Sequence, residues 1–114
     1  MPMDCLFCRI AAREIPATVV HETDTTLAFR DISPQAPTHV VVIAKRHDTD
    51  AVALAKAAPG VLDDLFLTAG EVAKAEGIDD SGYRLLFNTG PDAGQTVFHA
   101  HLHVLGGRPL GALA

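Results

Sequence analysis

In the stretch 96–105, histidines occupy three alternate positions and apolar residues fill the positions between them. Strict alternation over a short run predicts a β-strand, whose successive side chains point to opposite faces. We therefore expect His99, His101 and His103 to line one face of a sheet, with alternate residues about 6.5–7 Å apart. Three rings in that arrangement can surround one phosphate-sized or metal-sized ligand.

Three interpretations of this histidine row compete. A purely structural row is the weakest, because histidine is the usual acid, base, nucleophile and metal ligand near neutral pH. A phosphate site with a nucleophilic histidine remains, and so does a catalytic metal held by several histidines. A loop containing Gly90 and Gly94 precedes the row, and backbone N–H groups of such a loop can approach phosphate oxygens closely. His101, flanked by both other histidines, is the best nucleophile candidate.

Size and charge limit the classes of function. A chain of 114 residues with 48% hydrophobic residues fits one folded domain, residues 1–114. Its formal net charge of −5 argues against a nucleic-acid partner, which needs a basic surface. No apolar run approaches the length needed to span a bilayer, so we expect no membrane association. Residues 1–4 do not resemble the start of a signal peptide, and a cytoplasmic location is the expected default.

The rest of the chain predicts an α+β domain with a mainly antiparallel sheet of about five strands, one long helix and one short helix. Residues 38–44 form a β-branched run typical of a central buried strand, and residues 60–76 repeat apolar side chains at helical spacing. The other expected elements are a short helix over 5–13 capped by Asp4, a hairpin of strands 19–22 and 26–32, a weakly helical segment over 48–56, and a strand over 83–88 that pairs with the histidine strand.

Cys5 and Cys8 form a C-x-x-C pair near the N-terminus. A disulfide is the least favoured interpretation in a reducing cytosol. A redox pair of the thioredoxin kind would need a βαβ context. A zinc site needs two further ligands, and because the chain has no other cysteine, histidines would have to complete a Cys₂His₂ set. We favour zinc over two free thiols.

The residues also resemble a known family. Residues 99–105 fit the H-φ-H-φ-H-φ-φ signature of the histidine triad (HIT) superfamily, where φ is an apolar residue. The similarity to its Hint branch continues in the stretches 31–39, 94–97 and 105–108, and covers nearly the whole chain from Leu6 to Arg108.

This resemblance implies a HIT-like fold and a homodimer whose two sheets join. It also implies a purine nucleotide site and cleavage of the P–N bond of purine nucleoside 5′-phosphoramidates. His101 would be the nucleophile and form a nucleotidyl-histidine intermediate, while His103 would bind the α-phosphate. His99 and His39 would support the triad. Two alternatives stay open: a dinucleoside polyphosphate hydrolase of the fragile histidine triad type, and a nucleotide-binding regulatory module.

The same resemblance implies the remaining nucleotide contacts. Asp31 would bind the ribose, although the local sequence alone favours a turn cap at that position. The phosphate side would be lined by Asn88, Gly94, Gln95, Thr96 and Val97, and the base would lie among Phe7, Ile10, Phe29 and Ile32.

Some bacterial-type members of the superfamily carry a structural zinc on C-x-x-C and two histidines. The matching ligands are Cys5, Cys8, His47 and His99. One ring nitrogen of His99 cannot serve both a zinc ion and a substrate, so we expect a structural zinc that orients His99 rather than a catalytic one. The last four residues, 111–114, lack the Trp of better-known Hint proteins, which leaves the leaving-group preference open.

Overall fold

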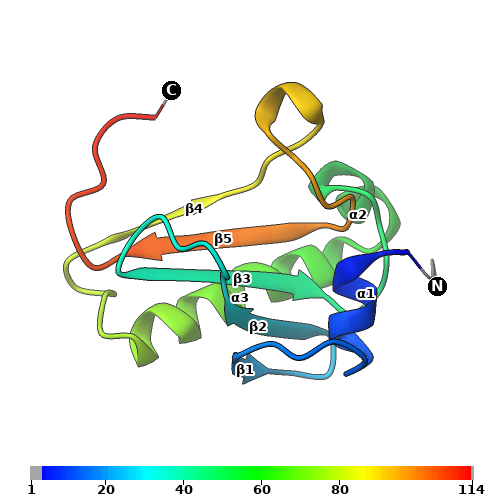
Figure 1. Ribbon diagram of the computed structural model, residues 1–114, viewed down its shortest axis with the longest axis horizontal. Coiled ribbons are helices and arrows are strands. Elements are labelled where there is room, and N and C mark those ends of the chain that lie inside the picture. The colour runs from blue at the N-terminus through cyan, green and yellow to red at the C-terminus, as the bar shows by residue number, and fades with distance from the viewer. Residues whose placement is uncertain (1–3, 114) are drawn as a thin grey trace.

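The computed structural model describes residues 4–113, and its centre is one antiparallel sheet of five strands (Figure 1). The strand order is β1-β2-β3-β5-β4, and every neighbouring pair runs antiparallel. This confirms the α+β prediction. The strands are β1 (Val19–Glu22), β2 (Thr26–Arg30), β3 (Thr38–Ala44), β4 (Tyr83–Leu86) and β5 (His101–Gly106).

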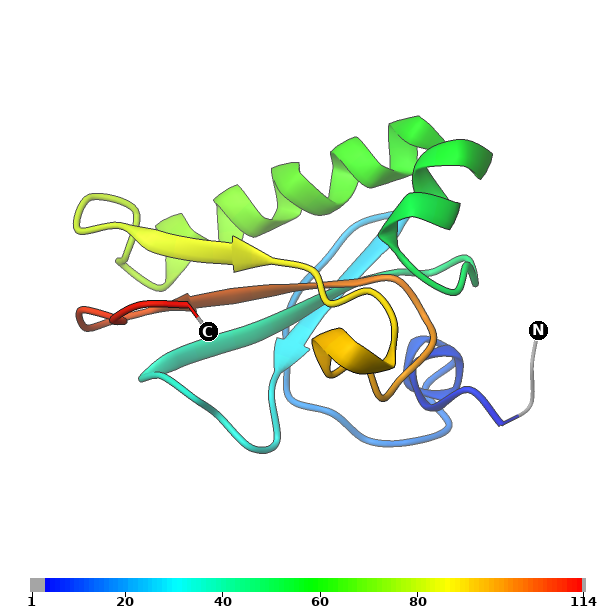
Figure 2. The same cartoon turned by 90° about the horizontal axis from the view of Figure 1, so that it is seen from above.

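Helices lie on both faces of this sheet. Figure 2 shows the long helix α3 along one face, with the short helix α1 and the turn η1 on the opposite side. The weakly helical segment forms a separate short helix, α2, that leads directly into α3. The bounds are α1 (Leu6–Ala11), α2 (Ala51–Ala57), α3 (Pro59–Ala75) and the 3₁₀ turn η1 (Pro91–Ala93).

The face covered by α3 is the main apolar core. Paired residues of adjacent strands point to the same face, so Val40 opposite Val104 and Val42 opposite Leu102 meet the helix together. Leu65 of α3 packs against this face and is completely buried. Burying a side chain of this size contributes about 1.5–3 kcal/mol.

The opposite face of the same strands carries the histidines. Val41 pairs with His103 and Ile43 with His101, and α1 adds Phe7 to a second apolar cluster on this side. The alternation along β5 therefore directs its apolar side chains toward α3. It places His101 and His103 on the opposite face, which also carries α1.

The histidine strand is shorter than predicted. β5 begins at His101, so the prediction that His99 lies on the same strand was wrong. The reason is the register: His101 pairs with Ile43, and β3 ends one residue later at Ala44. Beyond that point the backbone N–H of Ala100 donates to the carbonyl of Asp48 instead, at 2.8 Å.

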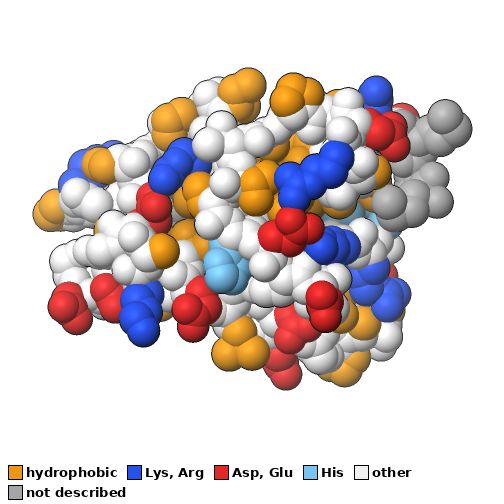
Figure 3. Space-filling view, turned by 90° about the horizontal axis from the view of Figure 1, so that it is seen from below, with side chains coloured by type: hydrophobic (Ala, Val, Ile, Leu, Met, Phe, Trp, Pro, Cys, Tyr) orange, Lys and Arg blue, Asp and Glu red, His pale blue; other side chains and the backbone are white. Residues whose placement is uncertain are grey.

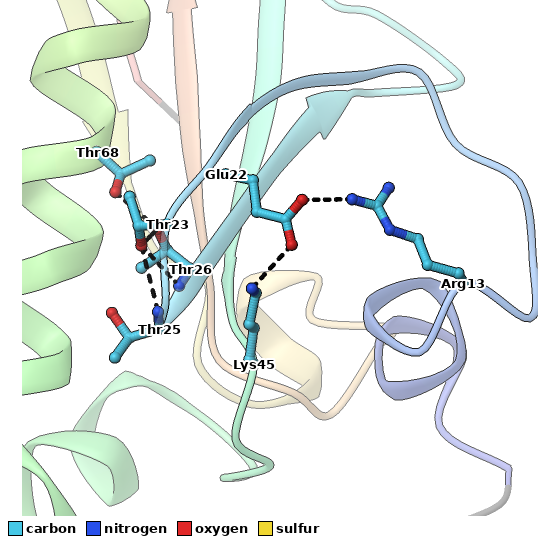
Figure 4. Close-up of polar contacts among 7 residues, drawn as sticks. All are labelled: Arg13, Glu22, Thr23, Thr25, Thr26, Lys45 and Thr68. Atoms are coloured by element: carbon cyan, nitrogen blue, oxygen red, sulfur yellow. Dashed lines mark hydrogen bonds and ion pairs between the residues drawn. The ribbon is translucent and has the colours of Figure 1, made fainter.

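The segment after α1 is tied to the sheet by an ion-pair network. Glu22 of β1 accepts hydrogen bonds from Arg13, just after α1, and from Lys45, just after β3 (Figure 4). These side chains are at least partly exposed, and exposed pairs contribute little to stability, about 0–1 kcal/mol each. Their effect is to fix where the segment after α1 meets the two strands.

Threonine hydroxyls attach the β1–β2 turn to α3 in the same region. Thr26 Oγ1 lies 2.8 Å from Thr68 Oγ1 on α3 and 2.6 Å from Thr23 Oγ1 (Figure 4). Thr25 Oγ1 donates to Asp64 on α3 at 2.7 Å. The turn is thereby held against the helix by side-chain contacts rather than by the sheet alone.

The surface seen from the β1 edge carries acidic and basic side chains close to one another (Figure 3). Among the described residues, no helix combines the length and the apolar composition that crossing a bilayer demands.

Substitution of Gly107, which directly follows β5, tests the packing at that end of the strand. Its φ is +95°, and an added Cβ would lie 2.9 Å from Pro37 Cβ. We expect Gly107→Ala to lower the free energy of unfolding by about 1–3 kcal/mol, because it adds both backbone strain and a clash. Urea denaturation measures this change. Gly60→Ala is the control: a Cβ there meets no atom within 4 Å, and because Gly60 lies in α3 we expect no loss of stability and a gain of at most about 1 kcal/mol. Equal effects of the two substitutions would contradict the assignment.

Candidate active site and metal centre

A cleft of about 550 Å³ opens beside α1 on the histidine face of the sheet. Its walls are mostly apolar, and His101 and His103 lie on one side of it. Nine of the ten residues predicted to bind a nucleotide line this cleft: Phe7, Ile10, Phe29, Asp31, Ile32, Asn88, Gly94, Thr96 and Val97.

Gln95 is the predicted contact that does not line the cleft. Its side chain is buried and braces the loop around η1 from inside. Oε1 accepts from Gly90 N–H at 2.8 Å, and Nε2 donates to the carbonyls of Thr49 at 2.8 Å and Val97 at 3.1 Å. Gln95 therefore shapes the loop that carries Thr96 and Val97.

The loop's own turn uses two of the N–H groups that were expected to face a phosphate. Gly94 N–H donates to the carbonyl of Pro91 at 3.0 Å, and Gln95 N–H donates to that of Gly90 at 3.1 Å. Gly94 adopts φ +87°, which closes this turn and suits glycine. Thr96 is the next residue along the loop, and it lines the cleft.

A backbone hydrogen bond fixes the tautomer of His101. Its Nδ1 lies 2.7 Å from the carbonyl oxygen of His99, and a carbonyl can only accept. Nδ1 must therefore carry the proton, and in the neutral ring Nε2 has a free lone pair. Phe7 packs edge-on against this ring, with 4.9 Å between centroids.

His103 has the opposite tautomer because of its contact with His39. The N–H of Gln35 donates to His39 Nδ1 at 3.0 Å, so the proton of a neutral His39 lies on Nε2. That Nε2–H points to His103 Nδ1 at 2.9 Å, which leaves the proton of His103 on Nε2. The neighbouring rings of His101 and His103, 5.0 Å apart, thus offer a lone pair and a donor respectively.

Burial keeps these rings neutral near pH 7. Removal from water lowers the pKa of His39 and of His101 below its usual value, although the Asp31 carboxylate opposes the shift. Burial, with the nearby His101 and His39, lowers the pKa of His103 to about 4. A neutral imidazole is the form that can act as a nucleophile.

Asp31 makes the turn cap that the local sequence predicts, and it also borders the cleft. Its Oδ1 accepts from the N–H of Ser33 at 2.8 Å, which is the turn cap. Its Oδ2 lies 3.5 Å from His39 Nε2, and the residue borders the cleft. A carboxylate has about four acceptor positions, so the cap leaves capacity for a ligand hydroxyl.

A second cluster lies behind the cleft, where Cys5, Cys8, His47 and His99 converge. His99 Nδ1 lies 3.3 Å from Cys5 Sγ, 3.4 Å from Cys8 Sγ and 3.3 Å from His47 Nδ1. In a tetrahedral zinc site, Zn–N and Zn–S bond lengths imply about 3.4 Å between nitrogens and about 3.6 Å between nitrogen and sulfur. The four donors fit a zinc ion.

The protonation of these donors fits a cation as well. His99 Nε2 lies 2.6 Å from the carbonyl oxygen of Ala44 and must donate to it, so Nδ1 presents its lone pair to the cluster. Burial and the neighbouring Cys5 raise the pKa of the Cys8 thiol to about 11 without a metal. A bound divalent cation supplies the charge that ionises such thiols.

Helix α1 is shaped by this cluster. Cys5, and not Asp4, is its N-cap residue, and Cys5 Sγ accepts from Cys8 N–H at 3.3 Å. The same helix brings Phe7 to His101 and Ile10 to the cleft. The C-x-x-C pair therefore connects the metal cluster to the wall of the cleft.

Asp31, His39 and His103 also lie close enough together to hold a metal. Their hydrogen bonds favour a different interpretation. Both ring nitrogens of His39 are already engaged, Nδ1 by Gln35 N–H and Nε2 by His103. Gln35 N–H, His39 and His103 instead form a hydrogen-bonded chain that sets the tautomer of His103, with the Asp31 carboxylate nearby.

Comparison with known proteins identifies the family to which this chain belongs. The family model for the HIT domain matches residues 12–110. The chain belongs to the HIT family. The purine nucleoside phosphoramidase of Escherichia coli K12 is 42% identical over 113 residues, covering 99% of this chain and 95% of the relative.

Two further proteins are similar to this chain over most of its length. A HIT family hydrolase from Clostridium thermocellum superposes with a TM-score of 0.94 at 41% identity, covering 99% of this chain and 98% of that one. The 14 kDa zinc-binding protein of Zea mays is 48% identical over 108 residues, covering 92% of this chain and 83% of the relative.

Sequence reasoning missed the parts of the HIT site that are made by backbone. The carbonyls of Ala44 and His99 and the N–H of Gln35 set the ring tautomers, and no side-chain pattern marks them. It also missed the extended segment 15–18, which forms part of the cleft wall. The only local signal there was Pro16, which favours an extended backbone at the residue before it.

The low pKa of His103 predicts a pH-dependent stability. The unfolded ring titrates near 6.5 and the folded ring near 4, so the unfolded chain binds more protons between these values. The free energy of unfolding should fall as the pH is lowered from about 7 to about 4, by at most about 1.4 kcal/mol per pH unit for this group. Urea denaturation of wild type and His103→Asn over this range tests it. The substitution should flatten the slope, and an unchanged slope would contradict the assignment.

Proposed function

We propose that this protein hydrolyses the P–N bond of purine nucleoside 5′-phosphoramidates through a covalent nucleotidyl-histidine. One observation carries the proposal: His101 presents a bare Nε2 beside the Nε2–H of His103 in the wall of an apolar cleft. A nucleophile and a donor side by side suit attack on a phosphorus atom. The identity with the E. coli phosphoramidase supports the substrate class.

The nucleoside would occupy the apolar end of the cleft. Ile32 is 98% exposed and Leu6 is 42% exposed at its border, an arrangement that a flat base would cover. Asp31 Oδ2 would accept from a ribose hydroxyl. The α-phosphate would then lie between Thr96 and the two histidines.

The first step is attack of His101 Nε2 on the α-phosphorus. The P–N bond breaks, and the amine leaves with a proton from solvent. The nucleotidyl ring carries a positive charge, which the hydrogen bond from Nδ1–H to the His99 carbonyl stabilises. His103 Nε2–H donates to a phosphate oxygen and stabilises the charge that develops there. Water then attacks the phosphorus, the P–Nε2 bond breaks, and the water gives up a proton to solvent, which releases the nucleoside monophosphate and neutral His101.

Substitution of the nucleophile is the first test. We expect His101→Asn to lower kcat/KM for adenosine 5′-monophosphoramidate by about ten-thousand-fold or more, because no other group replaces Nε2. Release of AMP in a coupled assay measures this. His21→Asn, on β1 and outside the cleft lining, should keep full activity. Full activity in His101→Asn would contradict the proposal.

The same assay separates the alternatives. A dinucleoside polyphosphate hydrolase would turn over diadenosine polyphosphates faster than the phosphoramidate. The Gly106-Gly107-Arg108 ending argues against that branch. A regulatory module would bind AMP in calorimetry and turn over no phosphoramidate. The intact arrangement of His101, His103 and His39 argues against a loss of catalysis.

We also propose that Cys5, Cys8, His47 and His99 hold a structural zinc ion. The donor distances support this, and so do the zinc-binding relatives from plants. When bound, zinc would link three segments through its four ligands: α1, the segment after β3 and the segment before β5. The reducing cytoplasm would keep both thiols available to the metal.

Metal analysis of protein purified without chelators tests this site. We expect about one zinc per chain, and far less in Cys8→Ser. His21→Asn should keep the full content. Chelation should lower the thermal stability, because a structural metal contributes directly to folding. Metal-free protein of unchanged stability would refute the site.

We further propose a homodimer joined along β4, an edge strand of the sheet. Apolar side chains gather there: Phe66 of α3 is 44% exposed and contacts Phe87, and Tyr83 of β4 is 37% exposed. Light scattering should give twice the 12.0 kDa mass of one chain. Phe66→Glu should yield monomer, and Val52→Glu on the exposed side of α2 should not. A monomeric wild type would end this proposal.

A further inference from the structure

His99 is held by three polar atoms, and two of them connect the metal donors to His101. Its ring Nδ1 lies among the metal donors, 3.3–3.4 Å from Cys5, Cys8 and His47. Its ring Nε2 donates to the carbonyl of Ala44 at 2.6 Å. Its backbone carbonyl accepts from His101 Nδ1 at 2.7 Å. The residue is completely buried, and these contacts together fix both its ring and its backbone carbonyl.

The sheet does not hold the carbonyl that His101 uses. His99 precedes β5, whose ladder with β3 begins at His101. The nearest backbone anchor is Ala100 N–H, which donates to Asp48 at 2.8 Å, and Asp48 directly follows His47. Both supports of this peptide therefore come from the metal cluster or from the residue beside it.

We infer that the metal centre positions the proposed nucleophile, because binding of Cys5, Cys8 and His47 together with the His99 ring fixes the His99 carbonyl that keeps the His101 proton on Nδ1. The inference rests on the proposed function for its role in turnover. The four ligands are positioning residues, since none of them lines the cleft. Cys5 and Cys8 therefore influence the ring of His101, although more than 90 residues separate them from it in the sequence.

Loss of the metal has a specific consequence under this account. The His99 ring would keep its bond to Ala44, but only weak thiol contacts would replace the metal bond at Nδ1. The segment from His47 to Asp48 that anchors the Ala100 N–H would also lose its link to the metal, so the His99 peptide would gain freedom to rotate. A weakened bond to the carbonyl lets the His101 proton move to Nε2, the atom that must attack phosphorus. The His39–His103 pair would not change, because Gln35 N–H fixes it near the start of β3, away from the metal cluster that follows the end of that strand.

Ring-nitrogen NMR at one fixed pH tests the inference without relying on activity. Long-range ¹H–¹⁵N spectra of the full chain are compared with zinc bound and after chelation. With zinc, His101 should show a protonated Nδ1 and a bare Nε2. After chelation, its two nitrogens should move toward the average of both tautomers, while those of His39 and His103 stay unchanged and report that the fold is intact. Unchanged His101 signals in metal-free, folded protein would overturn the inference.

A second variant covers the case in which metal-free protein unfolds. His47 is the partly exposed ligand, and His47→Gln should weaken zinc binding without uncovering the core. Zinc is then added in steps, and the His101 signals should follow the bound fraction while the His39 signals stay fixed. His101 signals that are independent of zinc occupancy would contradict the coupling.

Kinetics add a separate readout. In partly loaded His47→Gln, kcat for the phosphoramidate should fall about ten-fold or more, whereas the Kd for AMP should change less than about two-fold. An equal loss in both would indicate general damage and overturn the positioning role. If no phosphoramidate is turned over by wild type, the proposed function fails, and the NMR comparison still decides whether metal and His101 are coupled.

Discussion

Hydrogen bonds to three backbone groups determine what the histidines of this protein can do. Gln35 N–H makes His39 Nδ1 an acceptor, while the carbonyls of Ala44 and His99 make His99 Nε2 and His101 Nδ1 donors. Because each neutral ring has one proton, fixing one nitrogen fixes the other. His99 therefore presents a lone pair to the cysteine–histidine cluster, and His101 presents one to the cleft. Identical side chains, two residues apart, gain different chemistry from the backbone around them.

Those backbone groups are where they are because of the sheet. The β3–β5 register sets Ile43 beside His101 and ends the ladder there, which frees the residues before His101 to turn toward α1. The other faces of the same strands, packed under α3, form the larger apolar core. The rigid half of the domain thus supports a site whose N-terminal wall, α1, is attached by the cysteine–histidine cluster and by the Arg13–Glu22–Lys45 contacts.

The elements that depend on local pattern were predictable. The β-branched run of β3 was located correctly, and the helical repeat of α3 was located to within one residue at each end. The start of β5 was not predicted correctly. A strand can pair only as far as its partner extends, and the alternating pattern of residues 98–104 does not indicate that β3 ends at Ala44. The C-x-x-C pair predicted two members of the cysteine–histidine cluster, but only the resemblance to HIT proteins singled out His47 and His99. The tautomers of the histidine rings could not be predicted, because the backbone carbonyls that set them have no sequence signature.

The central claim is that His101 Nε2 attacks the α-phosphorus and holds the nucleotide covalently. Rapid acid quenching of the phosphoramidate reaction, followed by proteolysis and mass spectrometry, tests it most directly. The account predicts a nucleoside monophosphate attached to the peptide that contains His101, localised to that ring and present only during turnover. Steady turnover by wild-type protein with no nucleotide on His101 at any quench time would contradict it.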